Sequence, residues 1–104
     1  MWGESMPDYQ RWSDVAKALA HPLRLELVDT LSRQQEICVC ELADLLGQRQ
    51  ANVSKHLTVL REAGIVSNRR AGLKIFYRLQ ARCAVEFLHC FDRMPLQGKE
   101  VVRR

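Results

Sequence analysis

Two short runs of apolar residues at helical spacing, separated by one glycine, constrain the fold of this chain most strongly. Leu42 and Leu46 belong to a predicted helix over residues 41–46, and Gly47 ends it because glycine readily adopts the left-handed conformation of a helix terminus. A second helix is predicted over residues 50–63, with polar side chains on its outward face. Two short helices joined by a tight turn that contains glycine are typical of the helix-turn-helix motif.

The apolar pattern changes from helical spacing to alternation after Gly64, which ends the second of these helices. Residues 65–70 and 74–79 are predicted as two strands around Ala71-Gly72. The pattern therefore indicates a two-stranded β-hairpin with a basic tip. One face of its second strand holds Ile75, Tyr77 and Leu79, and the other holds Lys74, Phe76 and Arg78.

Three further helices are predicted, two before this region and one after it. Asp8 is placed as the N-cap of the first helix, and Pro22 begins the second, where its missing N–H group costs nothing. The last helix, over residues 81–93, is apolar on more than one side, so we expect it to pack on its own core and on a partner. The apolar side of the first helix is formed by Trp12, Val15, Ala16 and Leu19.

The length of 104 residues fits a single domain over residues 1–104, with an ordered core over about residues 9–94. The expected fold class is α+β, mainly α: a winged helix-turn-helix with five helices and a two-stranded hairpin as its wing. A domain of this size buries a limited core, so we expect a homodimer.

Charge and hydropathy exclude several classes of protein. The net charge of +4 and the pI near 9.1 suit a polyanionic partner. No apolar run approaches the ~20 residues that cross a bilayer, and the amino-terminal segment, with Glu4 and Asp8, does not resemble a secretory signal. We therefore expect a cytoplasmic protein without membrane contact, whose four cysteines are reduced.

The sequence Cys38-Val39-Cys40 is the most informative local feature for chemistry. On a regular helix the two side chains would diverge by ~200°, whereas in an extended segment they project to the same side. Two thiolates select soft ions. We therefore expect chelation by both sulfurs to distort the start of the helix over residues 41–46.

Two stretches of the chain resemble the ArsR/SmtB family of winged helix-turn-helix repressors. They are ELADLLGQRQANVSKHLTVLREAGIVSNRRAGLKIFYRL, residues 41–79, and ALAHPLRLELVDTL, residues 18–31. The resemblance implies a regulator rather than an enzyme, a homodimer built on the first and last helices, and a recognition helix in the major groove of operator DNA. It also implies that an effector releases the DNA.

The recognition helix implied by the resemblance starts near Gln50, so its first turns would face base edges, and the hairpin would contact phosphates or a minor groove. The alternative for each of these side chains is a solvated surface, and for His56 a packed, hydrogen-bonded position is equally expected. The candidate DNA-binding residues are Gln48, Gln50, Asn52, Ser54, Lys55, His56, Arg69, Arg70 and Lys74.

The segment CVCEL resembles the family's ligand-bearing CVCDL segment, which makes Cys38 and Cys40 the candidate metal ligands. The implied effectors are As(III) or Sb(III), or a soft divalent ion such as Cd(II), Pb(II) or Zn(II), and no organic cofactor is expected. The arsenic-type motif usually continues with a further cysteine where this chain has Ala43, and the chain has no cysteine before Cys38. Cys83 or Cys90 is the candidate third ligand, and both are equally consistent with buried apolar positions at a dimer interface.

Two alternatives remain open at the level of sequence. One is a repressor of the same fold whose cysteines respond to oxidants or polysulfide instead of metals. The other is a thiol enzyme or a metal-sequestering protein. The cysteines lack a C-x-x-C spacing and a recognisable base, and they are few for storage, so this second alternative is disfavoured.

Overall fold

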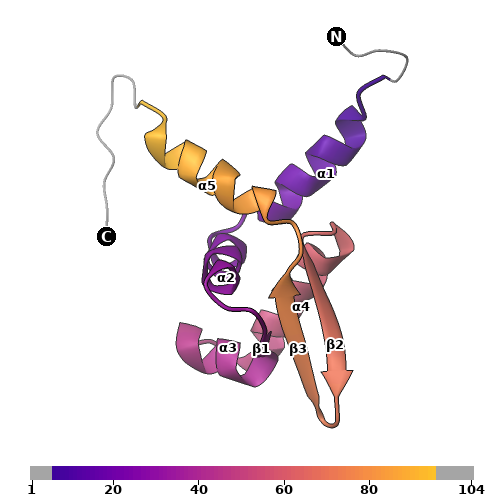
Figure 1. Cartoon of the computed structure of the whole chain (residues 1–104), viewed down its shortest axis with the longest axis vertical. Helices are drawn as coiled ribbons and strands as arrows, with labels where there is room; N and C mark the ends of the chain where they lie inside the picture. Colours follow the sequence, from indigo (N-terminus) through magenta and orange to yellow (C-terminus); the bar gives the residue numbers. More distant parts are fainter. Residues whose placement is uncertain (1–5, 96–104) are drawn as a thin grey trace.

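The computed structural model describes residues 6–95, which form five helices and three strands around one core (Figure 1). Residues 1–5 and 96–104, which include both ends of the predicted domain and the first residues of the amino-terminal segment, lie outside the described residues. No helix within residues 6–95 is long and apolar enough to cross a membrane. The elements are α1 (Tyr9–Leu19), α2 (Pro22–Ser32), β1 (Ile37–Cys38), α3 (Val39–Leu46), α4 (Gln50–Glu62), β2 (Val66–Ala71), β3 (Lys74–Leu79) and α5 (Cys83–Arg93).

The helix ends follow the local signals in the sequence. The Asp8 carboxylate accepts a hydrogen bond from the N–H of Arg11 at 2.9 Å, so it caps α1 as predicted. Pro22 occupies the first position of α2, as predicted. Gly47 ends α3 with a φ of 63°, in the left-handed region that disfavours residues with a Cβ atom.

The core lies where α2, α3 and α4 meet the inner face of the sheet. Its fully buried side chains come from all three helices, and Tyr77 and Leu79 of β3 cover it as the alternation predicted. Burial of these apolar side chains is the main source of the domain's stability. The largest fully buried side chains of the three helices are Leu27, Leu31, Leu42, Leu57 and Leu60.

The sheet has one strand more than the sequence predicts. Its order is β1-β3-β2, with all neighbours antiparallel, so the short segment before α3 extends the hairpin. The predicted turn at Ala71-Gly72 is wrong by one residue: Ala71 still pairs with Lys74, and the turn consists of Gly72 and Leu73. Gly72 adopts a φ of 64°, which a hairpin turn of two residues requires.

Two helix starts also differ from the prediction. The helix predicted over 41–46 begins earlier, at Val39, and the last helix begins at Cys83 rather than at residue 81. Both boundaries lie where polar or short segments give no apolar periodicity.

Helices α1 and α5 diverge from the body of the molecule at the end opposite the tip of the β2–β3 hairpin (Figure 1). Their contact with the core is made by small or aliphatic residues, such as Ala18 and Ala84. Large apolar side chains on both helices are more than half exposed, which leaves an apolar surface uncovered in one chain. These side chains are Tyr9, Trp12, Phe87 and Phe91.

Candidate nucleic-acid interface and thiol pair

Polar side chains gather where the turn after α3 leads into α4. Arg49 is the N-cap of α4 with extended backbone, and within residues 6–95 no side-chain hydrogen bond caps the first turn of this helix. Gln48, Gln50 and Lys55 are exposed, and Asn52 and Ser54 are half-buried. The surface thus offers amide, hydroxyl and ammonium groups together with free backbone N–H groups, which suit base edges and phosphates.

A hydrogen bond between two side chains orients part of this surface in the absence of DNA. The amide of Asn52 donates a hydrogen bond to Oε1 of Gln48 at 3.2 Å, which links the turn to the second helix of the motif. Both amides keep further donor and acceptor positions free, because an amide group has two donors and an accepting oxygen. The hydrogen bond between Gln48 and Asn52 can therefore fix the orientation of both amides and still leave donor and acceptor positions for a base edge.

His56 does not belong to this surface, so its inclusion among the DNA contacts is wrong. It is 6% exposed and lies on the buried side of α4, where its Nδ1 accepts a hydrogen bond from Nε of Arg24 at 3.1 Å. Burial lowers the pKa of His56, and the nearby charges of His21 and Arg24 act in the same direction. His56 therefore has the packed, hydrogen-bonded position that was the alternative to a DNA contact.

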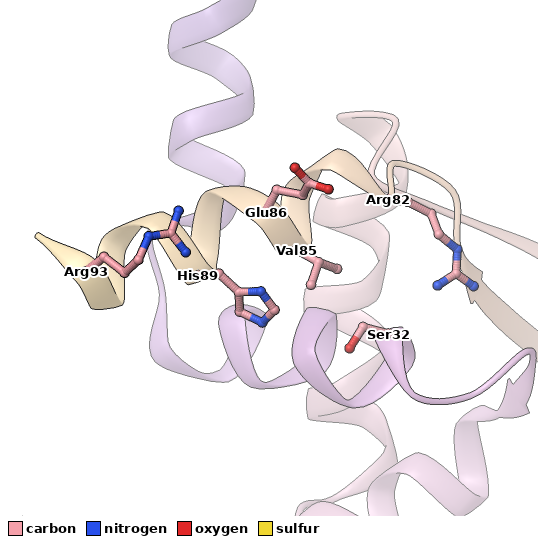
Figure 2. Close-up of a pocket in the computed structure, with 6 residues that line it drawn as sticks. All are labelled: Ser32, Arg82, Val85, Glu86, His89 and Arg93. Atoms are coloured by element: carbon pink, nitrogen blue, oxygen red, sulfur yellow. The ribbon is translucent and has the colours of Figure 1, made fainter.

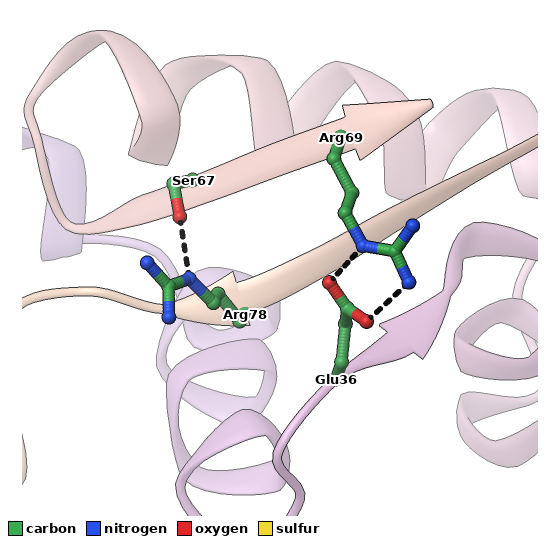
Figure 3. A network of polar contacts seen from close by, with 4 residues as sticks. All are labelled: Glu36, Ser67, Arg69 and Arg78. Carbon is green, nitrogen blue, oxygen red and sulfur yellow. Dashed lines mark hydrogen bonds and ion pairs between the residues drawn. The ribbon is translucent and has the colours of Figure 1, made fainter. Parts of the chain in front are cut away.

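The basic residues of the hairpin differ in their contacts. Arg70 and Lys74 are exposed near the tip. Arg69 is also exposed, but its Nε and Nη2 atoms donate to the two carboxylate oxygens of Glu36 at 2.7 and 2.8 Å (Figure 3). Its guanidinium lies 5.0 Å from the centre of the Phe76 ring. Arg69 is therefore committed to an internal ion pair in the isolated chain.

The sequence analysis did not predict a role for two residues of the candidate interface, Arg49 and Glu36. Arg49 has a simple signal, since it is a basic residue directly before a predicted recognition helix. Glu36 has none, because it meets Arg69 across 33 positions of chain and only the sheet brings the two together. The ion pair lowers the pKa of Glu36, chiefly through the hydrogen bond from Arg69.

The two candidate metal ligands meet at the junction of β1 and α3. Cys38 ends β1 and is the N-cap of α3 with extended backbone, while Cys40 lies in the first helical turn. Their sulfur atoms are 2.7 Å apart and share a hydrogen bond, and the Cys38 thiol lies 3.6 Å from Oε1 of Glu41. The sulfurs thus meet with α3 intact from Val39 onward. The expected distortion of the helix start is not needed to bring them together.

Access and protonation differ between the two thiols. Cys38 is 1% exposed, whereas Cys40 is half-buried, so a ligand from solvent reaches Cys40 first. The hydrogen bond with Cys38 raises the pKa of the Cys40 thiol, and desolvation and the charge of Cys38 raise it further. Lys74 acts in the opposite direction through its positive charge. A soft ion bound by both sulfurs must displace the thiol protons.

The described part of one chain brings no third ligand to this pair. Cys83 and Cys90 lie on α5, which is apart from α3 in Figure 1, and both are exposed rather than buried. Residues 6–95 contain no group of three or more histidine, cysteine or acidic side chains that could hold a metal ion. Two thiolates fit a thiophilic ion, and no further histidine, cysteine or acidic side chain within residues 6–95 of the same chain completes a group of three with them.

A hollow between α2 and α5 gives no second metal site. Figure 2 shows the Glu86 carboxylate turned away from α2, whereas the His89 ring points toward it. Arg82 and Arg93 line the same hollow. The side chains therefore diverge.

The arrangement of helices, turn and hairpin defines a winged helix-turn-helix domain, with α3 and α4 as the motif and β2–β3 as the wing. The solution structure of a homodimeric winged helix-turn-helix DNA-binding domain from Mycobacterium bovis superposes with a TM-score of 0.72, at 28% identity over 88% of this chain and 87% of that one. The predicted fold class is confirmed in its helices and its hairpin, to which the structure adds β1.

The chain belongs to the arsR family of bacterial regulatory proteins, whose family description matches residues 21–68. It is 43% identical to a biofilm growth-associated repressor of Xylella fastidiosa over 77 residues, which cover 74% of this chain and 67% of that repressor. It is 45% identical to an arsenic resistance transcriptional regulator of Pseudomonas putida over 65 residues, which cover 62% of this chain and 51% of the regulator. The chain thus spans about half the length of the latter. This family of regulators agrees with the expectation that the protein is not an enzyme.

Proposed function

We propose that this chain is a cytoplasmic transcriptional repressor that binds operator DNA as a homodimer and releases it when a thiophilic effector binds Cys38 and Cys40. The meeting of the two sulfur atoms at the start of the helix-turn-helix carries this proposal, because it places soft-ligand chemistry beside the DNA-reading element. The names of the relatives support a repressor, and one of them names arsenic.

The DNA-binding half of the proposal rests on the exposed end of α4 and on the wing. Gln50 and Asn52 offer amides suited to adenine, and Ser54 and Lys55 suit base edges or backbone. Arg70 and Lys74 lie beside the turn of the β2–β3 hairpin and supply positive charge for phosphates. The tip of this hairpin is at the same end of the molecule as α3 (Figure 1). Gln48 joins this surface through its hydrogen bond with Asn52.

The homodimer follows from the uncovered aromatic surface of α1 and α5. Four aromatic side chains that are more than half exposed are costly in water, and a second copy with the same surface covers them under two-fold symmetry. Two recognition helices related by that symmetry read a two-fold symmetric operator. Cys83 and Cys90 are on α5 and would lie at or near this interface.

The effector is proposed to be a trivalent or soft divalent ion, foremost As(III) or Sb(III), with Cd(II), Pb(II) and Zn(II) as further candidates. Cys40 captures the ion from solvent, and Cys38 beneath it completes a two-sulfur chelate. The third donor, from Cys83, Cys90 or a group outside residues 6–95, is supplied across the dimer or from a terminus.

Oxidation of the same pair is the second candidate, because sulfur atoms this close also favour a disulfide. In that reaction the two thiols lose two protons and two electrons to a peroxide, which is reduced to water. A polysulfide would instead insert its inner sulfur between the two atoms, and its two terminal sulfurs would leave as hydrogen sulfide, which carries away the two thiol protons. The two candidates share the site and differ only in the effector.

The test uses duplexes selected from a random pool by the reduced protein itself. Arsenite, antimonite, Cd(II), hydrogen peroxide and polysulfide are each titrated into the complex, and anisotropy of the labelled duplex reports release. We expect release by arsenite or another soft ion in the wild type, and none in Cys38→Ser or Cys40→Ser. Release that persists in both of the latter variants contradicts the thiol mechanism, and failure to select any duplex contradicts the repressor. Loss of release in Cys83→Ser or Cys90→Ser would identify the third donor.

A further inference from the structure

The ion pair between Glu36 and Arg69 joins the wing to the segment that carries the thiol pair. Arg69 lies in β2, in the wing, and Glu36 lies two residues before Cys38. The contact is bidentate, with the two parallel hydrogen bonds that a guanidinium also makes to a phosphate (Figure 3). The carboxylate thus occupies the position on Arg69 that a DNA phosphate would take.

The sheet places the same residues in one row. Cys38 of β1 is opposite Phe76 of β3, and Phe76 is opposite Arg69 of β2. Residues directly opposite each other on antiparallel strands share a face, so the buried thiol, the aromatic ring and the guanidinium follow one another across the outer face of the sheet. The guanidinium sits 5.0 Å from the centre of the ring, which holds it along this row.

We propose that Glu36 restrains the wing: it holds Arg69 away from the DNA backbone, and an effector on the Cys38–Cys40 pair tightens this restraint. The inference rests on the proposed function and names a regulatory residue within it. An exposed ion pair is weak partly because its side chains lose conformational entropy when they pair. An effector that bridges residues 38 and 40 already fixes the backbone from which Glu36 projects. Pairing with Arg69 then costs less conformational entropy, and the ion pair becomes stronger.

The restraint has a direct consequence for the number of phosphates contacted. Arg69 paired with Glu36 carries no net charge toward DNA, whereas released Arg69 neutralises one phosphate. Each neutralised phosphate steepens the dependence of log K on log salt by ~0.9. Glu36→Gln removes the charge that competes with the phosphate and leaves the side chain nearly the same size.

The closing experiment compares wild type, Glu36→Gln and Glu26→Gln on one selected duplex over a range of salt concentrations. Glu26 is exposed on α2 and is the matched control for the loss of one negative charge. For Glu36→Gln we expect binding about twofold to fivefold tighter than for the control, and a salt dependence steeper by ~0.9. Combining Glu36→Gln with Arg69→Ala should abolish both gains.

The coupling to the thiols has its own readout. We expect arsenite to lower the duplex affinity of Glu36→Gln by a smaller factor than that of wild type. In protein without DNA, we expect arsenite to shift the NMR signal of the Arg69 Nε–H group in wild type and not in Cys38→Ser.

Binding by Glu36→Gln that is weaker than, or equal to, that of the control overturns the restraint. If the NMR signal of the Arg69 Nε–H group does not shift with arsenite in the wild type, the coupling between the thiol pair and the ion pair is contradicted. If the wild type binds and releases DNA and Glu36→Gln behaves identically, this inference alone is contradicted. If the wild type binds no duplex, the proposed function is contradicted as well.

Discussion

Replacing Gly47 by alanine tests the turn on which the helix-turn-helix geometry depends. Gly47 ends α3 with φ 63° and ψ 36°, and a Cβ atom built there meets no atom within 4 Å. The substitution therefore has a backbone cost without a steric clash. The left-handed conformation costs an L-residue about 1–2 kcal/mol, and the reduced freedom of the unfolded chain offsets about 0.4–1 kcal/mol of that. The expected net loss of stability is about 1 kcal/mol.

Urea denaturation at one fixed protein concentration measures this loss, because the stability of a dimer depends on concentration. A change of about 1 kcal/mol corresponds to a shift of about 4–8 °C in Tm for a domain of this size. Gly47→Asn is the matched control, since asparagine tolerates the left-handed region better than alanine. If Gly47→Ala is as stable as wild type, or less perturbed than Gly47→Asn, the turn does not have the conformation described.

Three further predictions concern DNA, the dimer and the effector. Arg70→Ala should weaken binding to all duplexes alike and reduce the salt dependence by ~0.9, whereas Gln50→Ala should relax the preference at particular base pairs; equal effects on every sequence from both variants would contradict the division of roles. Introducing charge into the aromatic surface with Trp12→Lys or Phe91→Lys should produce monomers in sedimentation, and an unchanged dimer would place the interface elsewhere. Cd(II) affinity should rise with pH below the pKa of the Cys40 thiol, since this cation displaces the thiol protons into solution, and a pH-independent Cd(II) affinity measured by calorimetry would argue against thiolate ligation.

Local signals in the sequence were sufficient to predict the five helices and several of their ends. The Asp8 cap, the proline at the start of α2 and Gly47 each act through the backbone of their own neighbours, so no tertiary information is needed to interpret them. The alternation over β3 likewise predicted that Tyr77 and Leu79 face the core. The hairpin turn was misplaced by one residue because either pair, Ala71-Gly72 or Gly72-Leu73, offers a glycine to the turn.

Contacts between distant parts of the chain could not be predicted. Strand β1 has two residues, too few for an alternating pattern, and it forms only because β3 offers an unpaired edge. The meeting of Glu36 with Arg69 depends on that added strand. His56 occupies a helical position that faces α2, which is apparent only once Arg24 lies beside it.

The contact between the thiols of Cys38 and Cys40 could be predicted only in part from the sequence. Spacing alone left open whether Cys38 and Cys40 project together or apart, because the answer depends on which of them is helical. Extended backbone at Cys38 and helical backbone at Cys40 decide it. The sequence therefore singled out two cysteines whose sulfur atoms meet in the structure, and the boundary of α3 determines how they meet. Their role as ligands stays a prediction.

The most direct test of this account is a titration of arsenite into a preformed complex of the reduced dimer with its selected duplex, followed by DNA anisotropy. The account predicts complete dissociation once each subunit has taken up one arsenite, and no dissociation over the same range when Cys40 is replaced by serine. A complex that remains intact while both subunits of the wild type are saturated would contradict the claim that thiol ligation and DNA binding oppose each other.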